Sequence, residues 1–282
     1  MGSQPKSPTY SANGRGRWSQ GQQDPVLRGL YIIVTLLCLY MVFWILIFPA
    51  SSFQEHSEWR RVLFAKVTPP DGVTPADIIT KYQHQTLVQR THILPGAVWA
   101  VLVPIQLHRP TILRGRRYRT VHRYAGYIFL SSVLLMSLGV VAIVYKDLTF
   151  EDYFAEQWDE DQHAGAPVVS ASSVASTKAS LLLGSIYFAA TALVAVRAAR
   201  DGRIRDHQRA ILRHVGSGLW IALQRILVVW VIGPLVGQPV PPAHQRWYFM
   251  VAAYIGTVLT VGGAELAIRR LSAVVPPQRK EL

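Results

Sequence analysis

The sequence predicts an all-α integral membrane protein, a bundle of six transmembrane helices with both termini in the cytoplasm. Two observations predict this fold: six apolar stretches of near-span length, and arginines that crowd alternate connections between them. The stretches cover about residues 26–49, 88–107, 124–145, 179–198, 214–236 and 248–268. Each is near the roughly 20 residues that cross a hydrocarbon core about 30 Å thick.

The basic residues set the orientation of the bundle. Six arginines lie in the connection 109–123 and six in 197–213, whereas the connection 146–178 contains two lysines and no arginine. Cytoplasmic loops of membrane proteins carry an excess of Lys and Arg. The two arginine-rich connections and both termini are therefore predicted to be cytoplasmic.

Two tails flank the predicted transmembrane domain of residues 26–268. Residues 1–25 are rich in Ser, Gln, Gly and Pro, and such a segment cannot bury enough apolar surface to fold. It is predicted to be a disordered cytoplasmic tail. Residues 269–282 are predicted to form a short basic tail on the same side.

The strongly positive net charge of the chain indicates which kind of molecule it is expected to bind. A net charge of +13 and a pI near 10.2 would indicate nucleic acid as the partner of a soluble protein. Here the basic residues flank apolar stretches, so the expected partners are the lipid bilayer and its anionic headgroups, and not nucleic acid. The single cysteine, Cys38, excludes a disulfide within one chain.

Polar residues inside apolar stretches are the candidate functional residues, because they are costly in lipid and usually face the bundle interior. By depth they form two levels. His92 belongs near the external level, whereas the cytoplasmic level contains His122, His207, His214, Gln106 and Glu265. A site that combines His122 with either His207 or His214 is sterically possible. Histidines on two helices at one depth predict a shared site.

Helical periodicity places further residues near that site. At 100° per residue, His207, His214 and Arg225 share one stripe. Arg225 is expected near the bilayer centre, about 16 Å from the cytoplasmic end of its stretch. A buried ion pair that fixes helix register is the alternative role for Arg225 and for Glu265.

Several short motifs carry a family resemblance. They are Thr91-His92-Ile93, Pro104-Ile105-Gln106, His122-Arg123 with Gly126, Asp206-His207-Gln208-Arg209 through Arg213, Arg225, and Ala264-Glu265. In this order they resemble the polytopic membrane family catalogued as domain of unknown function 2306, over about residues 85–268. His214 is not part of the pattern. The resemblance implies a helical membrane fold and not a reaction.

Three functions remain open from the sequence. In the first, a membrane redox protein, His122 and His207 ligate haem b near the cytoplasmic face, and Arg123, Arg213 or Arg225 neutralises its propionates. In the second, His122, His207 and Glu265 hold a divalent metal. In the third, the protein is a non-catalytic transporter-like or scaffold component whose polar stripe fixes helix packing.

Several enzyme classes lack their sequence signatures. The chain has no recognisable nucleophile with its base, no phosphate-binding loop and no dinucleotide fingerprint. Hydrolase, kinase and soluble dehydrogenase activities are therefore not expected, and whether the protein is an enzyme stays open.

Overall fold

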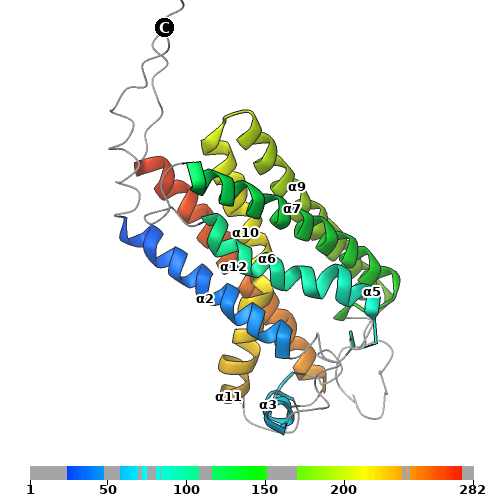
Figure 1. The fold of residues 1–282 in the computed structure, drawn as a ribbon. Helices are drawn as coiled ribbons and strands as arrows, with labels where there is room; N and C mark the ends of the chain where they lie inside the picture. Colours follow the sequence, from blue (N-terminus) through cyan, green and yellow to red (C-terminus); the bar gives the residue numbers. More distant parts are fainter. Residues whose placement is uncertain are drawn as a thin grey trace, which may run out of the picture.

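The computed structural model describes residues 24–47, 58–68, 72–74, 81–82, 84–107, 116–150, 170–236, 240 and 242–274. Within these residues the regular structure is entirely helical (Figure 1). Its elements are α2 (Pro25–Ile47), α3 (Glu58–Val67), α5 (Thr86–Val88), η2 (Gln89–Ile93), α6 (Leu94–Leu107), α7 (Arg116–Tyr145), α9 (Ala171–Arg200), α10 (Ile204–Ile226), η3 (Leu227–Ile232), α11 (Gly233–Val236) and α12 (Pro242–Val274). The predicted all-α bundle is confirmed.

Five helical segments are long and apolar enough to cross a membrane: Pro25–Ile47, Arg119–Tyr145, Ala171–Arg200, Ile204–Val236 and His244–Ala273. The chain is therefore a multi-pass integral membrane protein. The predicted second span, 88–107, is helical from α5 through α6 but is not one of the five. Its polar side chains and two prolines, Pro95 and Pro104, make it the least apolar of the six stretches.

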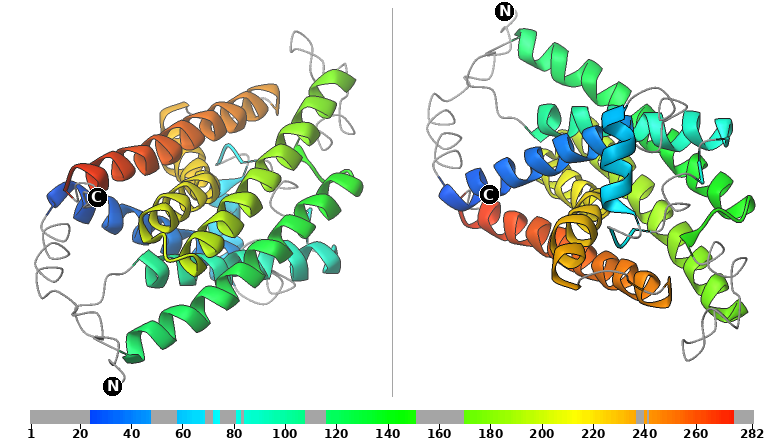
Figure 2. Two further views of the ribbon diagram at one scale, coloured as in Figure 1. Left: turned by 90° about the horizontal axis from the view of Figure 1, so that it is seen from above. Right: turned by 90° about the horizontal axis from the view of Figure 1, so that it is seen from below.

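The helices pack in a closed ring. α2 packs against α6, α6 against α7, α7 against α9, α9 against α10, α10 against α12, and α12 against α2. Views from above and from below show the α7–α9 pair on one side and the α2–α12 pair on the other, with α10 between them (Figure 2). α10 also contacts α2, so this helix joins the two halves of the ring.

Two stretches of π-helix interrupt the bundle. η2 ends just before Pro95, and η3 ends just before Gly233-Pro234. Proline has no backbone N–H, so the i→i−4 ladder is broken at each of these points. A locally widened helix is one way to accommodate the break, and π-helical turns are frequent at functional sites.

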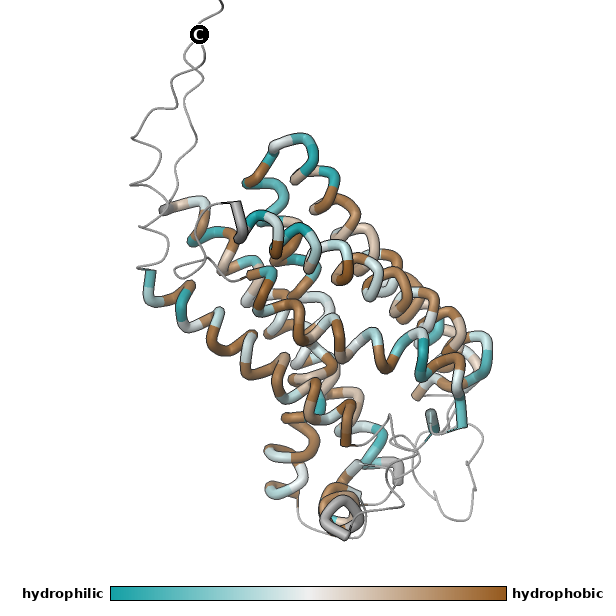
Figure 3. Tube along the Cα trace, in the orientation of Figure 1, coloured by the Kyte–Doolittle hydropathy of each residue, from teal (hydrophilic) through white to brown (hydrophobic). Residues whose placement is uncertain are grey.

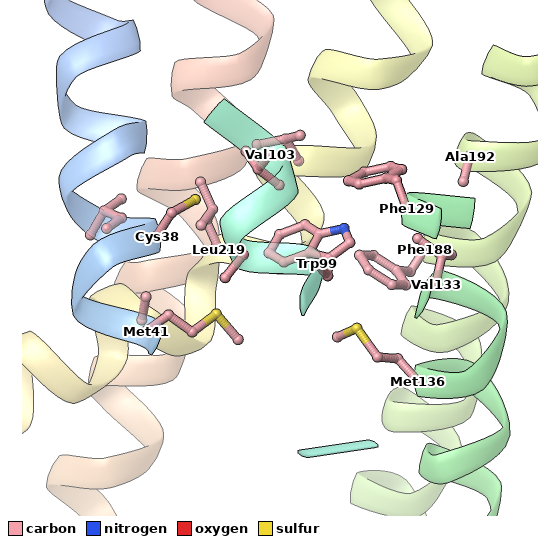
Figure 4. Close-up of a cluster of buried hydrophobic side chains, with 14 of the residues drawn as sticks. Cys38, Met41, Trp99, Val103, Phe129, Val133, Met136, Phe188, Ala192 and Leu219 are labelled. Atoms are coloured by element: carbon pink, nitrogen blue, oxygen red, sulfur yellow. The ribbon is translucent and has the colours of Figure 1, made fainter. Parts of the chain in front are cut away.

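The core lies around Trp99 of α6, which is fully buried. Figure 4 shows its indole between Leu219 and Cys38 on one side and Phe129 and Phe188 on the other. These side chains come from α10, α2, α7 and α9. One aromatic residue on the least apolar helix therefore packs against four other helices.

α10 and α12 approach each other through glycines. A Cβ atom added at Gly216 would lie 2.8 Å from the Ala264 Cβ and 2.9 Å from the Thr260 carbonyl oxygen. One added at Gly256 would lie 2.9 Å from the Trp220 carbonyl oxygen. Small residues permit such close crossing in membranes, where packing replaces the hydrophobic effect between helices.

The outer surface of the bundle is apolar along the helices and polar at their ends (Figure 3). Large exposed side chains include Leu39 on α2, Leu138 on α7, Leu183 on α9 and Val258 on α12. The turn between α9 and α10 is hydrophilic. Apolar side chains that would be unfavourable in water are the expected surface of a protein surrounded by lipid.

The first two helical stretches begin and end within two residues of the prediction, whereas α7, α9, α10 and α12 begin six to ten residues earlier than predicted. α10 begins at Ile204, ten residues before the predicted start at 214, so His207 is inside the helix. α12 continues to Val274, six residues beyond the predicted end of the transmembrane domain. Nearly all of the predicted tails, residues 1–23 and 275–282, lies outside the described residues.

Candidate functional site

Two imidazole rings lie side by side at one end of the bundle. His122 is on α7 and His207 is in the first turn of α10. Their ring centroids are 6.3 Å apart and their planes are inclined by 85°. Both residues are half-buried. The structure thus brings together the two histidines that the sequence placed at one depth.

One nitrogen of His207 is fixed by the backbone of α9. Its Nδ1 lies 2.9 Å from the carbonyl oxygen of Ala195. A carbonyl only accepts, so Nδ1 carries the proton and Nε2 keeps its lone pair. This tautomer is the one in which an imidazole ligates a metal through Nε2 while its other nitrogen is oriented by a hydrogen bond.

The turn before His207 sets the position of α10. Gly202 has a φ of +73°, a conformation that glycine adopts without strain. Arg203 donates to Asp201 at 3.1 Å and to Asp206 at 2.9 Å. Asp206 also lies in the first turn of α10, where the helix dipole favours a negative charge. The turn holds His207 next to α9.

Gln106 belongs to the same end of the bundle. Its Nε2 lies 3.3 Å from the carbonyl oxygen of His122. The Gln106 amide also lies opposite Gly126, one turn after His122, at 3.8 Å from the position a Cβ would take. The end of α6 is therefore joined to α7 beside the imidazole pair, at the level that the sequence predicted for Gln106.

Glu265 has a different partner from the one the metal hypothesis requires. Arg213 donates from Nε to Glu265 Oε1 at 2.7 Å and from Nη2 to Oε2 at 3.3 Å. This two-pronged ion pair joins α10 to α12, and both side chains are about two-fifths exposed. Within the described segments, no three His, Cys, Asp or Glu side chains form a group that could hold a metal ion.

His214, two turns after His207 on α10, is a buried core residue. Its Nδ1 lies 2.9 Å from the Phe188 carbonyl oxygen, and its Nε2 accepts a hydrogen bond from Trp99 Nε1 at 2.9 Å. The Phe188 ring stacks on it at 4.2 Å. Both ring nitrogens are engaged, so His214 has no lone pair available for a ligand.

His92 lies apart from this group, near the other end of the bundle. Its Nδ1 lies 3.1 Å from the Met136 carbonyl oxygen on α7. The helices touch at this point, since a Cβ at Gly139 would lie 2.5 Å from the His92 Cβ. Fourteen residues separate His92 from Gln106, or roughly 21 Å of helix. His92 therefore does not reach the imidazole pair.

Arg225 is also remote from the histidines. It follows His207 by 18 residues on α10, about 27 Å at 1.5 Å per residue. The prediction that Arg225 assists a cofactor bound at His207 is therefore wrong on distance. Arg225 lies 11 residues before Val236, in the middle of the predicted stretch 214–236, and its depth near the bilayer centre stays a prediction.

The Arg225 guanidinium lies between aromatic rings. Its Cζ is 4.5 Å from the centre of the Phe249 ring and 5.7 Å from that of Trp44. Tyr40 and Tyr82 interact with it electrostatically. Its Nε and Nη1 atoms are buried and have no hydrogen-bond partner in the described part of the chain. An unsatisfied neutral donor that is buried costs roughly 1–3 kcal/mol of stability, and an unsatisfied charged donor costs more.

Most of these side-chain partners could not be predicted from the sequence. Trp99 shares a helical face with His92 and Gln106, but nothing local in the chain pairs it with His214. The rings around Arg225 come from α2 and α12. Such pairings depend on how each helix is rotated about its axis, which hydrophobic periodicity fixes only coarsely.

Comparison with known proteins adds no relative to this description. No protein-family model, no curated protein and no solved structure matches the chain. The functional argument therefore depends on the geometry of the residues described above.

Proposed function

We propose that this multi-pass membrane protein binds one haem b at the end of the bundle that carries the arginine-rich turn, with His122 and His207 as its two axial ligands. The observation that supports it is the spacing of the two rings, 6.3 Å between centroids. Two imidazoles on opposite sides of one metal, each at about 2 Å, have ring centres about 6 Å apart. The inclination of 85° between the rings is compatible with this arrangement, because two imidazoles can bind one metal without being parallel.

The number of available ligands favours haem over a bare ion. Structural and catalytic sites for bare ions use three or four protein ligands, and the described residues offer two imidazoles with Glu265 engaged by Arg213. A porphyrin supplies four nitrogen ligands itself and needs two axial ligands from the protein. The pair of histidines therefore fits haem better than it fits the divalent metal of the second hypothesis.

Bound haem would give the protein one-electron redox chemistry. The role of the chain is to hold the two imidazoles. His207 is held in the required tautomer by the Ala195 carbonyl, and His122 lies in a turn whose backbone is tied to Gln106. Under this proposal the protein is a membrane redox or accessory protein.

An absorption spectrum tests the proposal. The full-length protein is expressed with ample haem supply, purified in a neutral detergent, and measured before and after dithionite. We expect a Soret band and, after reduction, the sharp α and β bands of a six-coordinate haem, at about one haem per chain. Purified, monodisperse protein with no Soret band would overturn the proposal.

A second candidate is a non-catalytic transporter-like or scaffold component. His214 favours it, because this histidine lies on the same helix and serves packing alone. In this case the contact between His122 and His207 is an edge-to-face ring packing. The double substitution of both by Ala would then change the yield of folded protein and no spectrum or metal content.

We also propose that all six helical stretches cross the bilayer and that both termini are cytoplasmic. The helical stretch 86–107 and the arginine distribution support this topology. Anionic headgroups would bind the arginine-rich connections, and the family catalogued as domain of unknown function 2306 is the proposed relationship. Tags at residues 1 and 282 should react only after permeabilisation; reaction in intact cells would contradict the topology.

A further inference from the structure

A second site lies at the opposite end of α10 from the histidines, around Arg225. Its walls are the ends of two helices: Trp44 is three residues before the end of α2, and Phe249 is seven residues after the start of α12. The guanidinium contacts both rings. Because Arg225 is about 27 Å along the helix from His207, this site is independent of the proposed haem site.

The charge of Arg225 is not balanced by the residues around it. In the described part of the chain, the groups that interact with it electrostatically are the phenols of Tyr82 and Tyr40. Burial raises the pKa of Tyr82 to about 12, so this phenol is neutral at physiological pH. Contacts with neutral aromatic rings compensate only part of the cost of burying this cation, because cation–π contacts do not replace hydrogen bonds to its N–H groups.

Unsatisfied hydrogen-bonding atoms gather at this site. In the described part of the chain, Arg225 Nε and Nη1 are buried without a hydrogen-bond partner. The Tyr40 hydroxyl is buried as well; the Trp230 side chain interacts with it, but no described group has the distance and angle of a hydrogen bond to this hydroxyl. The great majority of buried polar groups in proteins are hydrogen-bonded. The π-helix η3 begins at Leu227, two residues after Arg225, and π-helical turns are frequent at functional sites.

The neighbouring surface is apolar and exposed. Tyr40 is in ring contact with Phe43 at 6.5 Å, and the Phe43 and Trp230 side chains are 47% and 55% exposed. In a membrane these side chains would face lipid. A ligand that reaches Arg225 from this side would place a polar head among buried donors and a hydrocarbon chain against exposed aromatic rings.

We infer that Arg225, with the Tyr40 hydroxyl, binds the oxyanion head of a lipid-soluble amphiphile, a carboxylate or a phosphate ester, whose chain lies against Phe43 and Trp230. A guanidinium is well suited to both head groups, because its planar array of N–H donors matches their oxygen atoms. The bound oxyanion supplies a negative charge that the described side chains around Arg225 lack, and it accepts hydrogen bonds from the Arg225 N–H groups that have no described partner.

Binding of defined amphiphiles tests the inference. The full-length protein in dodecyl maltoside is titrated with oleate, with dodecyl phosphate and with oleyl alcohol, and the Kd of each is measured by calorimetry. We expect at least one of the two anions to bind at least about 10-fold more tightly than the neutral alcohol, the gain of one charged hydrogen bond. Oleate preference identifies a carboxylate ligand, and dodecyl phosphate preference identifies a phosphate ester.

Variants assign the binding to this site. Arg225→Gln should raise the Kd of the preferred anion at least about 10-fold. Tyr40→Phe, which keeps the ring and removes the hydroxyl, should raise it about 3-fold or more. Arg90→Gln is the matched control, since Arg90 is an exposed arginine on η2 that belongs neither to this site nor to the arginine-rich connections. Arg209→Gln tests instead whether the oxyanion binds at the arginine-rich end of α10, where Arg209 is exposed and bonds only Ser272 among the described partners. Arg225→Lys replaces Arg225→Gln if the latter does not fold, with the same expected direction.

Two outcomes would overturn the inference. One is equal affinity of the wild-type protein for the alcohol and both anions. The other is anion binding that survives in the folded Arg225 variant and in Tyr40→Phe while Arg209→Gln weakens it, which would place the oxyanion at the arginine-rich end of α10. Neither outcome bears on the haem spectrum, so the two proposals fail separately.

Discussion

His207 and His214 lie two turns apart on α10, and their surroundings differ in one respect that separates their roles. His214 has a partner on each ring nitrogen, Phe188 on one side and Trp99 on the other. His207 has one described hydrogen bond, from Nδ1 to the Ala195 carbonyl oxygen. No described hydrogen bond involves its Nε2, and the His207 ring lies next to the ring of His122. A position on a shared helical stripe therefore does not assign a role to a histidine, whereas the number of ring nitrogens already engaged does.

The largest expected effect follows from the proposed haem site. Under that proposal, His207→Ala should reduce haem from about one per chain to less than about 0.1, because one of the two proposed protein ligands is lost. His214→Ala should retain haem in whatever fraction of the protein folds. The measurement is the pyridine haemochrome assay on the monodisperse fraction. His207→Met is the conservative control, since Met also ligates haem iron and should restore binding with an altered reduction potential.

Two results would contradict this assignment of the histidines. If His207→Ala keeps its haem while His214→Ala loses it among folded chains, the assignment of the two histidines is reversed. Equal retention by both variants would remove α10 from the haem site altogether.

Stability should rank the two histidines in the opposite order. His214→Ala removes a buried ring and leaves the Trp99 N–H without an acceptor, which should cost about 3–5 kcal/mol of unfolding free energy. His207→Ala removes a half-buried ring and should cost within about 1 kcal/mol in the haem-free protein. Unfolding titrations in mixed micelles of mild and denaturing detergent measure both. Comparable losses would show that His207 is a packing residue too.

Part of this picture was predictable from the sequence, because it depends on local patterns. Apolar stretches and clustered arginines predicted the helical bundle, and the position of each histidine along its stretch predicted that His122 and His207 share a depth. Depth follows from residue number at 1.5 Å per residue, so no knowledge of neighbouring helices was needed.

The rest depends on contacts between helices that are distant in sequence. Glu265 was predicted to be a metal ligand or a member of an ion pair, and the structure pairs it with Arg213 across α10 and α12. Arg225 was expected to assist the histidines or to form an ion pair, and it lies between Phe249 and Trp44 instead. Neither set of partners was predictable, because periodicity gives the face of a helix and not the helix that faces it.

A smaller loss of stability is expected from a substitution at Gly218 of α10, where Trp99, the hydrogen-bond partner of His214, packs against this helix. A Cβ at Gly218 would lie 2.7 Å from Trp99 Cη2 and 2.9 Å from Phe188 Cε2. Gly218→Ala should therefore displace the rings that hold His214 and cost about 1–3 kcal/mol. Gly184→Ala is the control, because nothing lies within 4 Å of its Cβ position, and it should stabilise α9 by up to about 1 kcal/mol.

The two glycine variants also separate the two histidines. Gly218→Ala should lower stability without changing the haem content of the folded protein, since its contacts are with the His214 group. A parallel loss of haem would mean that the two groups are coupled through α10.

The smallest effect is expected at the Arg213–Glu265 ion pair. From the sequence, Arg213 was assigned to the haem propionates and Glu265 to a metal site. Both side chains are about two-fifths exposed, so solvent screens the pair and its contribution to stability should be within about 1 kcal/mol. Arg213→Gln and Glu265→Gln should each shift unfolding by this amount, and 1 M salt, which shortens the Debye length to about 3 Å, should reduce the difference from wild type. Haem content should stay unchanged in both variants. A loss of haem in Arg213→Gln alone would instead show that this arginine contacts the cofactor, and would extend the site from the imidazole pair towards α12.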